Sequence, residues 1–133
     1  CDILAPCAVG AVINPETAEK FKCEIIAGSA NNQLLNEEDE LLLKKRNILY
    51  TPDFIINVGG MIDVSEEYLG YKTGYKKEKV KRKTENIYDR VLEIFKDAEA
   101  ENITAHRAGI CCAEQRIASI TRIKGTFCGK GKM

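Results

Sequence analysis

Three short segments of the sequence carry the residue types best suited to holding a small molecule. They are Pro6-Cys7-Ala8, Gly28-Ser29-Ala30-Asn31-Asn32, and the stretch from Asp53 through Gly60. Glycine and alanine allow a ligand to approach the backbone closely, and the amide of an asparagine donates and accepts hydrogen bonds without adding charge. A segment of this composition is also typical of an ordinary turn, so each one alone is weak evidence for a binding site.

The residues around these segments predict a parallel sheet. Strands are expected over residues 2–5, 24–27 and 48–50, each shortly before one of the three segments. The first intervening helix should begin at Asn14, a favourable N-cap with proline after it, and run to about Phe21. The second should follow Asn36, with acidic residues in its first turn and basic residues in its last. This β-α-β-α-β order predicts right-handed parallel connections, and ligands of such sheets bind at the carboxyl ends of the strands.

Beyond Gly60 the sequence pattern is helical. One helix is expected from Met61 to about Tyr68, a second with the apolar repeat Ile87, Val91 and Ile94, and a last one with the repeat Ala113, Ile117 and Ile120, before a frayed tail from Gly125. Three strands are half of the roughly six in a doubly wound nucleotide-binding domain. Neither a GxGxxG nor a Walker loop is present.

We therefore expect an α/β fold in which residues 1–72 form the second half of a Rossmann-type parallel sheet. Residues 73–133 should form C-terminal helices that pack back toward an inter-domain cleft. Because the chain opens directly on a strand, upstream sequence is expected in the parent protein.

The composition narrows the function classes. Twenty basic residues balance twenty acidic ones, which argues against a protein that coats nucleic acid or an anionic membrane. Six cysteines without a CxxC pair, and a single histidine, give no recognisable metal site. No signal peptide or apolar stretch of membrane-spanning length is apparent. These features favour a reduced, cytoplasmic protein.

The order and sequence of the three segments resemble one enzyme family. Residues 1–8, 26–34 and 50–60, followed by 63–64, 67–71 and 113–117, resemble the glutamate/leucine/phenylalanine/valine dehydrogenases, and most closely their leucine branch. The resemblance implies a homo-oligomer that uses NAD for the reversible oxidative deamination of a branched-chain L-amino acid to its 2-oxo acid and ammonia. It places Cys7, Ala8, Asn31 and Asn32 beside the cofactor, and Asn32, Met61 and Val64 on the substrate side.

The same resemblance places the family's catalytic lysines, phosphate loop and ribose-binding acid upstream of this chain, so no residue here is expected to be catalytic. Residues 106–112 depart from the family's usual acidic, leucine-bearing sequence, which leaves the register of the last helix open.

Other interpretations stand beside these. By spacing alone, Met61 and Val64 are ordinary helix-core residues, and Asn31 and Asn32 are a turn and a helix entry. The basic stretch from Lys72 to Lys83, with interleaved tyrosines, favours a solvated helix face or inter-subunit surface over an RNA-binding face. His106 is expected to be a lone surface histidine. The function alternatives are a valine or phenylalanine dehydrogenase, or a truncated, non-catalytic binding or assembly module.

Overall fold

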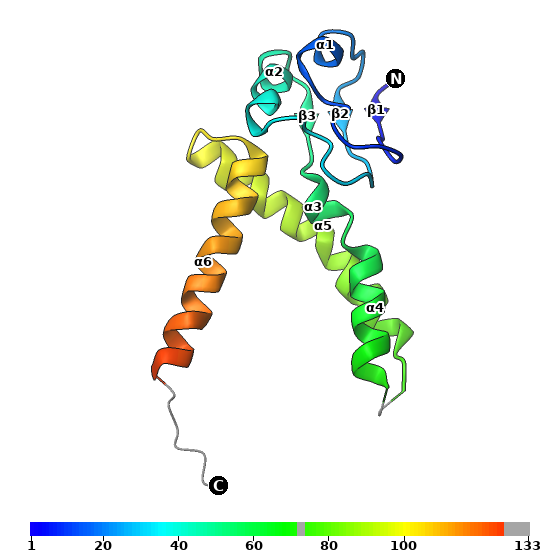
Figure 1. The fold of residues 1–133 in the computed structure, drawn as a ribbon, viewed down its shortest axis with the longest axis vertical. Coiled ribbons are helices and arrows are strands. Elements are labelled where there is room, and N and C mark those ends of the chain that lie inside the picture. The colour runs from blue at the N-terminus through cyan, green and yellow to red at the C-terminus, as the bar shows by residue number, and fades with distance from the viewer. Residues whose placement is uncertain (72–73, 127–133) are drawn as a thin grey trace, which may run out of the picture.

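The computed structural model describes residues 1–71 and 74–126, with side chains described as far as Arg122. It is an α/β fold in which a three-stranded sheet is followed by long helices (Figure 1). The strands are β1 (Ile3–Leu4), β2 (Ile25–Ile26) and β3 (Leu49–Tyr50), in the order β1-β2-β3. Both pairings are parallel. The predicted fold class is confirmed, with strands shorter than expected.

The first connection contains α1 (Pro15–Ala18), and its start is as predicted. The Oδ1 atom of Asn14 accepts hydrogen bonds from the backbone N–H groups of Glu16 and Thr17. The prediction that this helix reaches Phe21 is wrong. Lys20 N–H bonds to the Thr17 carbonyl in a tight turn, and the Arg46 guanidinium donates to the carbonyls of Ala18 and Phe21, so those carbonyls are satisfied outside a helix.

The second connection contains a 3-10 turn, η1 (Glu37–Asp39), and α2 (Glu40–Lys45). Asn36 stands at the N-cap position, and the Asp39 carboxylate reaches back to its backbone N–H at 2.9 Å. The sheet and these helices share a core of Ile13, Ala18, Ile26, Leu43, Ile48 and Tyr50. This core fixes the strands so that their carboxyl ends meet at one edge.

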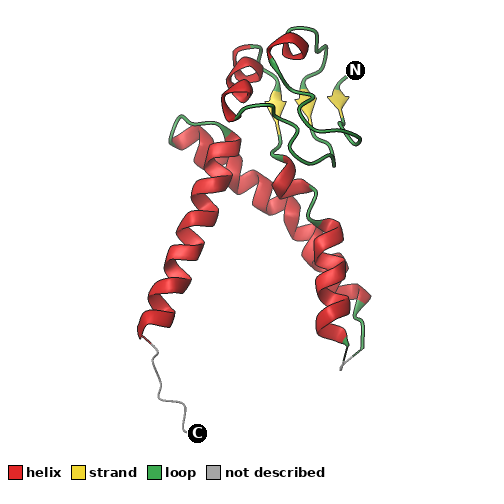
Figure 2. Cartoon of the chain, in the orientation of Figure 1, coloured by secondary structure: helices red, strands yellow, loops and turns green. Residues whose placement is uncertain are grey.

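Four helices follow the sheet: α3 (Asp53–Ile56), α4 (Gly59–Gly70), α5 (Lys77–Ala100) and α6 (Ala105–Thr126) (Figure 2). Ile94 and Ala98 of α5 pack against Ala105 and Ala108 of α6 in a second buried cluster. Beyond this junction α6 extends away from the sheet (Figure 1). Over residues 1–71 and 74–126, every helix is too short or too polar to cross a membrane.

The predicted apolar repeats are helical but unequally buried. On α5, Ile94 is buried, and Ile87 and Val91 are half-buried. On α6, the residues Ala113, Ile117 and Ile120 are all exposed, so their repeat forms no core within the described residues. The frayed tail was predicted to begin at Gly125, but α6 continues through Thr126. The rest of that tail lies outside the described residues.

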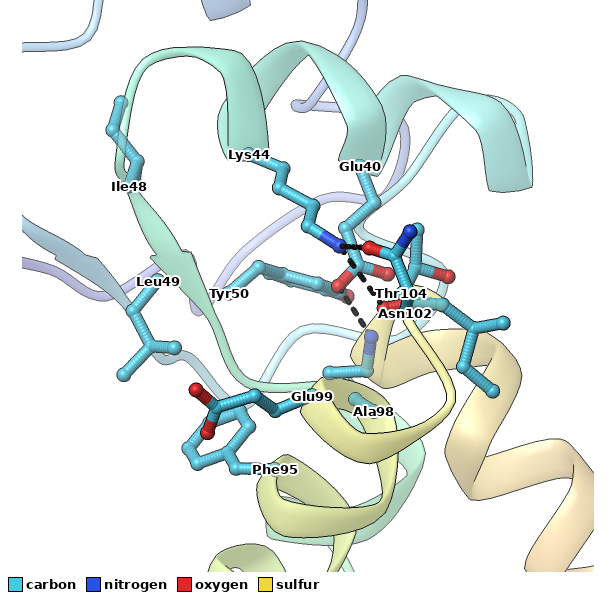
Figure 3. A pocket seen from close by; sticks show the side chains of 12 residues that line it. Glu40, Lys44, Ile48, Leu49, Tyr50, Phe95, Ala98, Glu99, Asn102 and Thr104 are labelled. Carbon is cyan, nitrogen blue, oxygen red and sulfur yellow. Dashed lines mark hydrogen bonds between the residues drawn. The ribbon is translucent and has the colours of Figure 1, made fainter.

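The start of α6 is tied to α2 by a buried carboxylate. Glu40 is 6% exposed, and its two oxygens accept hydrogen bonds from the backbone N–H groups of Ala105, at 2.9 Å, and His106, at 3.0 Å. Lys44, one turn later, donates to the side chain of Asn102 and to the Ile103 carbonyl. Figure 3 shows Glu40 and Lys44 reaching from α2 toward the connection between α5 and α6. These bonds form a clamp that sets where α6 begins, which the sequence left open.

His106 is not a lone surface histidine, so that prediction is wrong. Its side chain is only 16% exposed, and its ring packs edge-on against Phe54 with 5.1 Å between the ring centroids. The N–H bond to Glu40 draws the residue inward, because the first N–H groups of a helix need acceptors when they are buried.

Replacing Glu40 by alanine should lower the free energy of unfolding by about 1–3 kcal/mol, because two N–H groups at the start of α6 lose their acceptor. Urea denaturation of the 133-residue chain, followed by circular dichroism, measures this change. Glu38→Ala is the matched control, since Glu38 is exposed on the adjoining turn and its loss should cost less than about 0.5 kcal/mol. Equal losses in the two variants would contradict the clamp.

The contribution of Glu40 to stability should also fall as the pH rises. Burial raises the pKa of Glu40 above its ordinary value of 4.5, although the N–H groups of His106 and Ala105 oppose that shift. Its contribution is therefore complete below the ordinary value and is lost as the pH rises through the raised value. Denaturation of the wild-type chain and of Glu40→Gln across this range should give a stability advantage of wild type that shrinks with pH. An advantage that grows with pH would refute the stated sign.

Candidate functional site

The three predicted segments meet at the carboxyl edge of the sheet. Ala30 N–H donates to the Pro6 carbonyl at 2.9 Å, and Ala11 N–H donates to the Asn32 carbonyl at 2.7 Å. Gly28 is required here, because a Cβ atom at this position would collide with the backbone of Pro6. The segments after β1 and β2 are therefore in direct backbone contact, with no space for a side chain at position 28.

Asn31 and Asn32 lie at this edge with exposed side chains. The Asn31 Oδ1 atom accepts a hydrogen bond of 2.5 Å from Asn57 Nδ2, which joins the segment after β2 to the turn before α4. Asn32 has a left-handed backbone, with φ of +53°, and its N–H donates to Asp53 Oδ2 at 2.6 Å. The segments that follow β2 and β3 are thus connected through both asparagines.

The Asp53 carboxylate is buried, with 6% of the residue exposed. Its second oxygen, Oδ1, accepts a hydrogen bond of 3.2 Å from the Tyr50 hydroxyl. Burial raises the pKa of Tyr50, and the negative charge of Asp53 adds to that effect, so the hydroxyl remains a donor. Tyr50, the last residue of β3, therefore orients the carboxylate that accepts the Asn32 N–H.

Cys7 and Ala8 are exposed at the end of β1. A hydrogen bond from the Ser29 hydroxyl, with a smaller contribution from the Ser29 backbone N–H, lowers the pKa of the Cys7 thiol. Cys7 follows β1 and Ser29 follows β2, so this contact places Cys7 beside the segment after β2.

Met61 and Val64 lie on α4 rather than in the strand-end segments. They are 75% and 61% exposed, so the interpretation that they are helix-core residues is wrong within the described part of the chain. The Asn57–Asn31 bond connects the strand-end segments to the turn that begins α4. Two apolar side chains that no core covers remain available to contact an apolar molecule.

A cavity of about 300 Å³ adjoins this edge of the sheet. Asn32 and Asp53 line one part of it, and Phe54 and His106 line another, together with Leu34, Leu35, Asn36 and Glu37. The cavity therefore extends from the left-handed asparagine to the first turn of α6. Within the residues that the structure describes, no three histidine, cysteine, aspartate or glutamate side chains form a metal-binding group.

A second cavity, of about 430 Å³, lies outside this edge, between α2, β3 and the junction of α5 and α6 (Figure 3). Phe95, Leu49 and Ile103 give it an apolar wall, and Lys44 and Glu99 are charged groups at its margin. No sequence pattern predicts this cavity, because its lining comes from segments about fifty residues apart.

The basic stretch has a structural role that the sequence did not reveal. Glu66 of α4 has a side chain only 3% exposed, and it pairs with Lys79 at 2.7 Å and Lys83 at 3.9 Å. These lysines therefore neutralise a buried carboxylate and join α4 to α5. Lys72, at the beginning of the predicted stretch and at the predicted domain boundary, lies outside the described residues.

Sequence reasoning did not single out Asp53, Asn57 or Tyr50. Asp53 and Asn57 belong to a segment chosen for its composition, yet nothing in their spacing indicates that they reach the segment after β2. The one available signal is the sequence Tyr50-Thr51-Pro52-Asp53, which places a hydroxyl and a carboxylate three residues apart at the end of a strand.

Comparisons with known proteins identify the family. The family model described as glutamate/leucine/phenylalanine/valine dehydrogenase matches residues 1–125. The chain is 45% identical to a leucine dehydrogenase of Thermoactinomyces intermedius over 127 residues, which are 96% of this chain and 34% of that enzyme. It is 52% identical to a phenylalanine dehydrogenase of Bacillus thermotolerans over 116 residues, 87% of this chain and 29% of that enzyme.

A solved structure shares both fold and sequence. The crystal structure of L-tryptophan dehydrogenase from Nostoc punctiforme superposes with a TM-score of 0.82 at 43% identity, over 91% of this chain and 36% of that one. The chain thus spans about a third of the length of the relatives it matches. These relatives carry leucine, phenylalanine and tryptophan in their names, so similarity alone does not fix the substrate. The chain belongs to the glutamate/leucine/phenylalanine/valine dehydrogenase family of amino-acid dehydrogenases.

Proposed function

We propose that this chain is part of an NAD-dependent leucine or branched-chain amino-acid dehydrogenase. Such an enzyme converts an L-amino acid, NAD⁺ and water to the 2-oxo acid, ammonium and NADH, with release of a proton, and the reaction is reversible. The observation that carries the proposal is the meeting of Cys7, Ser29, Asn31 and Asn32 at the carboxyl edge of a parallel sheet, where ligands of such sheets bind.

The residues at this edge suit the nicotinamide part of NAD. The exposed amides of Asn31 and Asn32 can donate and accept hydrogen bonds, and Cys7 and Ala8 leave the surface small and uncharged. A neutral lining is favourable because the nicotinamide ring gains and loses charge during the reaction. When bound, NAD supplies the hydride acceptor, and this chain's residues orient it and exclude water on one side.

The exposed apolar residues of α4 support an apolar substrate. Met61 and Val64, both exposed, would contact the substrate side chain, and Asn32 would contact it from the cofactor side. An apolar lining favours a leucine, isoleucine or valine side chain and disfavours the carboxylate of glutamate, which would lose its hydration without a cation to replace it. A phenylalanine-specific enzyme is the alternative that the 52% identical relative favours.

We further propose that residues 1–72 complete a nucleotide-binding domain, that residues 73–133 pack toward its cleft, and that the catalytic groups belong to the rest of the enzyme.

The exposed Ile117 and Ile120 on α6, with Tyr68 and Leu69 on α4, support a homo-oligomer, since apolar surfaces of this kind are usually covered. The five described cysteines are unpaired, which supports the reducing cytoplasm as the location.

The direct test joins this chain to the remaining two thirds of the Thermoactinomyces intermedius leucine dehydrogenase. We expect this joined enzyme to reduce NAD with leucine and valine at a kcat/KM at least about tenfold above that with glutamate, because an apolar pocket rejects a carboxylate. The absorbance of NADH reports each rate. A kcat/KM for phenylalanine above that for leucine would instead assign the enzyme as a phenylalanine dehydrogenase. A folded but wholly inactive joined enzyme would refute the proposal and support a non-catalytic assembly module.

NAD should also protect Cys7 of the joined enzyme from alkylation. At an NAD concentration ten times the Kd, we expect iodoacetamide to modify Cys7 about tenfold more slowly, as measured by peptide mass spectrometry. Cys23 is the internal control, because it precedes β2 at the opposite edge of the sheet and its rate should not change. Without NAD, Ser29→Ala should slow the reaction of Cys7, since the lost hydroxyl bond raises the thiol pKa. Equal protection of Cys7 and Cys23 would argue against cofactor binding at this edge.

A further inference from the structure

We infer that Asp53 is a positioning residue of the cofactor site, which it serves by fixing the backbone of Asn32. The inference rests on the proposed function and assigns a task to a residue that would touch neither substrate nor cofactor. Asp53 Oδ2 accepts the Asn32 N–H at 2.6 Å, from a carboxylate that is almost fully buried. A short bond to an ionised acceptor is among the strongest hydrogen bonds available in a protein.

This bond acts on a residue that needs such a restraint. Asn32 adopts a φ of +53°, a region that residues other than glycine seldom occupy, although asparagine tolerates it better than most. The backbone angle determines where the Asn32 side chain points from the edge of the sheet. A restraint on the N–H is therefore a restraint on the amide that the proposed function assigns to the cofactor.

Asp53 is itself oriented by the protein. Its other oxygen accepts a hydrogen bond from the buried Tyr50 hydroxyl. Tyr50 is the last residue of β3, and Asp53 is the first residue of α3. Among the described residues no ion pair involves Asp53. Its carboxylate therefore interacts with the backbone N–H of Asn32 and the Tyr50 hydroxyl.

The rest of the loop is held by contacts that do not involve Asp53. Gln33 is fully buried, and its Nε2 atom donates to the carbonyls of Gly28 and Ala30. Ala11 N–H bonds to the Asn32 carbonyl from the other side. Loss of the Asp53 carboxylate should therefore release the Asn32 N–H and change its orientation without unfolding the loop.

The first experiment measures amide hydrogen exchange in the 133-residue chain by NMR. Asp53→Asn should speed exchange of the Asn32 N–H by about tenfold or more, because a bond to a charged acceptor becomes a weaker, neutral one. Asp39→Asn is the matched control: Asp39 is equally buried and also accepts a backbone N–H from an asparagine, but its partner is Asn36 rather than Asn32. An unchanged rate at Asn32, or faster exchange throughout the chain, would overturn the inference.

The second experiment measures kinetics in the joined enzyme. Asp53→Asn should raise the KM for NAD about tenfold or more with a smaller effect on the KM for leucine, and Asp39→Asn should change neither. Asn32→Gly keeps the left-handed backbone without the amide. If Asp53 acts through that amide, Asp53→Asn should add almost nothing in the Asn32→Gly background.

The outcomes separate this inference from the proposed function. If Asp53→Asn raises the KM for NAD by the same factor with and without Asn32→Gly, the positioning role is overturned. The dehydrogenase assignment is unaffected by that result. If the joined enzyme with the unchanged chain is inactive with every substrate, the proposed function fails, and hydrogen exchange still decides whether Asp53 holds Asn32.

Discussion

The hydrogen bond from the Asn32 N–H to the Asp53 carboxylate is the contact on which the candidate site depends. Each strand of the sheet is only two residues long, so ladder hydrogen bonds alone cannot fix the segments that follow. Asp53 at the end of β3 holds the segment after β2, and Ala11 and Ala30 join that segment to the one after β1. The edge therefore presents a single surface rather than three independent turns.

Long-range contacts of the same chemical type position the helices. Glu40 accepts the first N–H groups of α6 across 65 residues of chain, and Glu66 of α4 pairs with lysines of α5. In each case a buried carboxylate is retained because donors surround it, since an unpaired buried charge would be strongly destabilising. The exposed apolar residues of α4 and α6 are a different matter, because the described residues provide no core for them. The buried carboxylates therefore stabilise the fold, whereas the exposed apolar residues of α4 and α6 are available to bind a ligand or another protein surface.

Local rules predicted the features that neighbouring residues determine. The start of α1 followed from Asn14-Pro15-Glu16, and the three parallel strands followed from apolar runs between helices. Asn31 and Asn32 were singled out by the family resemblance instead, and their role beside the cofactor stays a prediction. The same rules failed for the end of α1, where Arg46 binds carbonyls some twenty-five residues earlier in the chain. They failed again for His106 and did not single out Asp53. Burial and distant partners decide the roles of those residues, and neither quantity is visible in local composition or spacing.

The most direct measurement is a crystal structure of the joined enzyme with NAD bound. Our account predicts the nicotinamide within hydrogen-bonding distance of the Asn32 side chain, with the Asn32 backbone still left-handed and its N–H on Asp53. It also predicts Cys7 beside the cofactor. A structure in which NAD lies away from this edge of the sheet, or in which Asn32 contacts NAD after its N–H has left Asp53, would contradict the account.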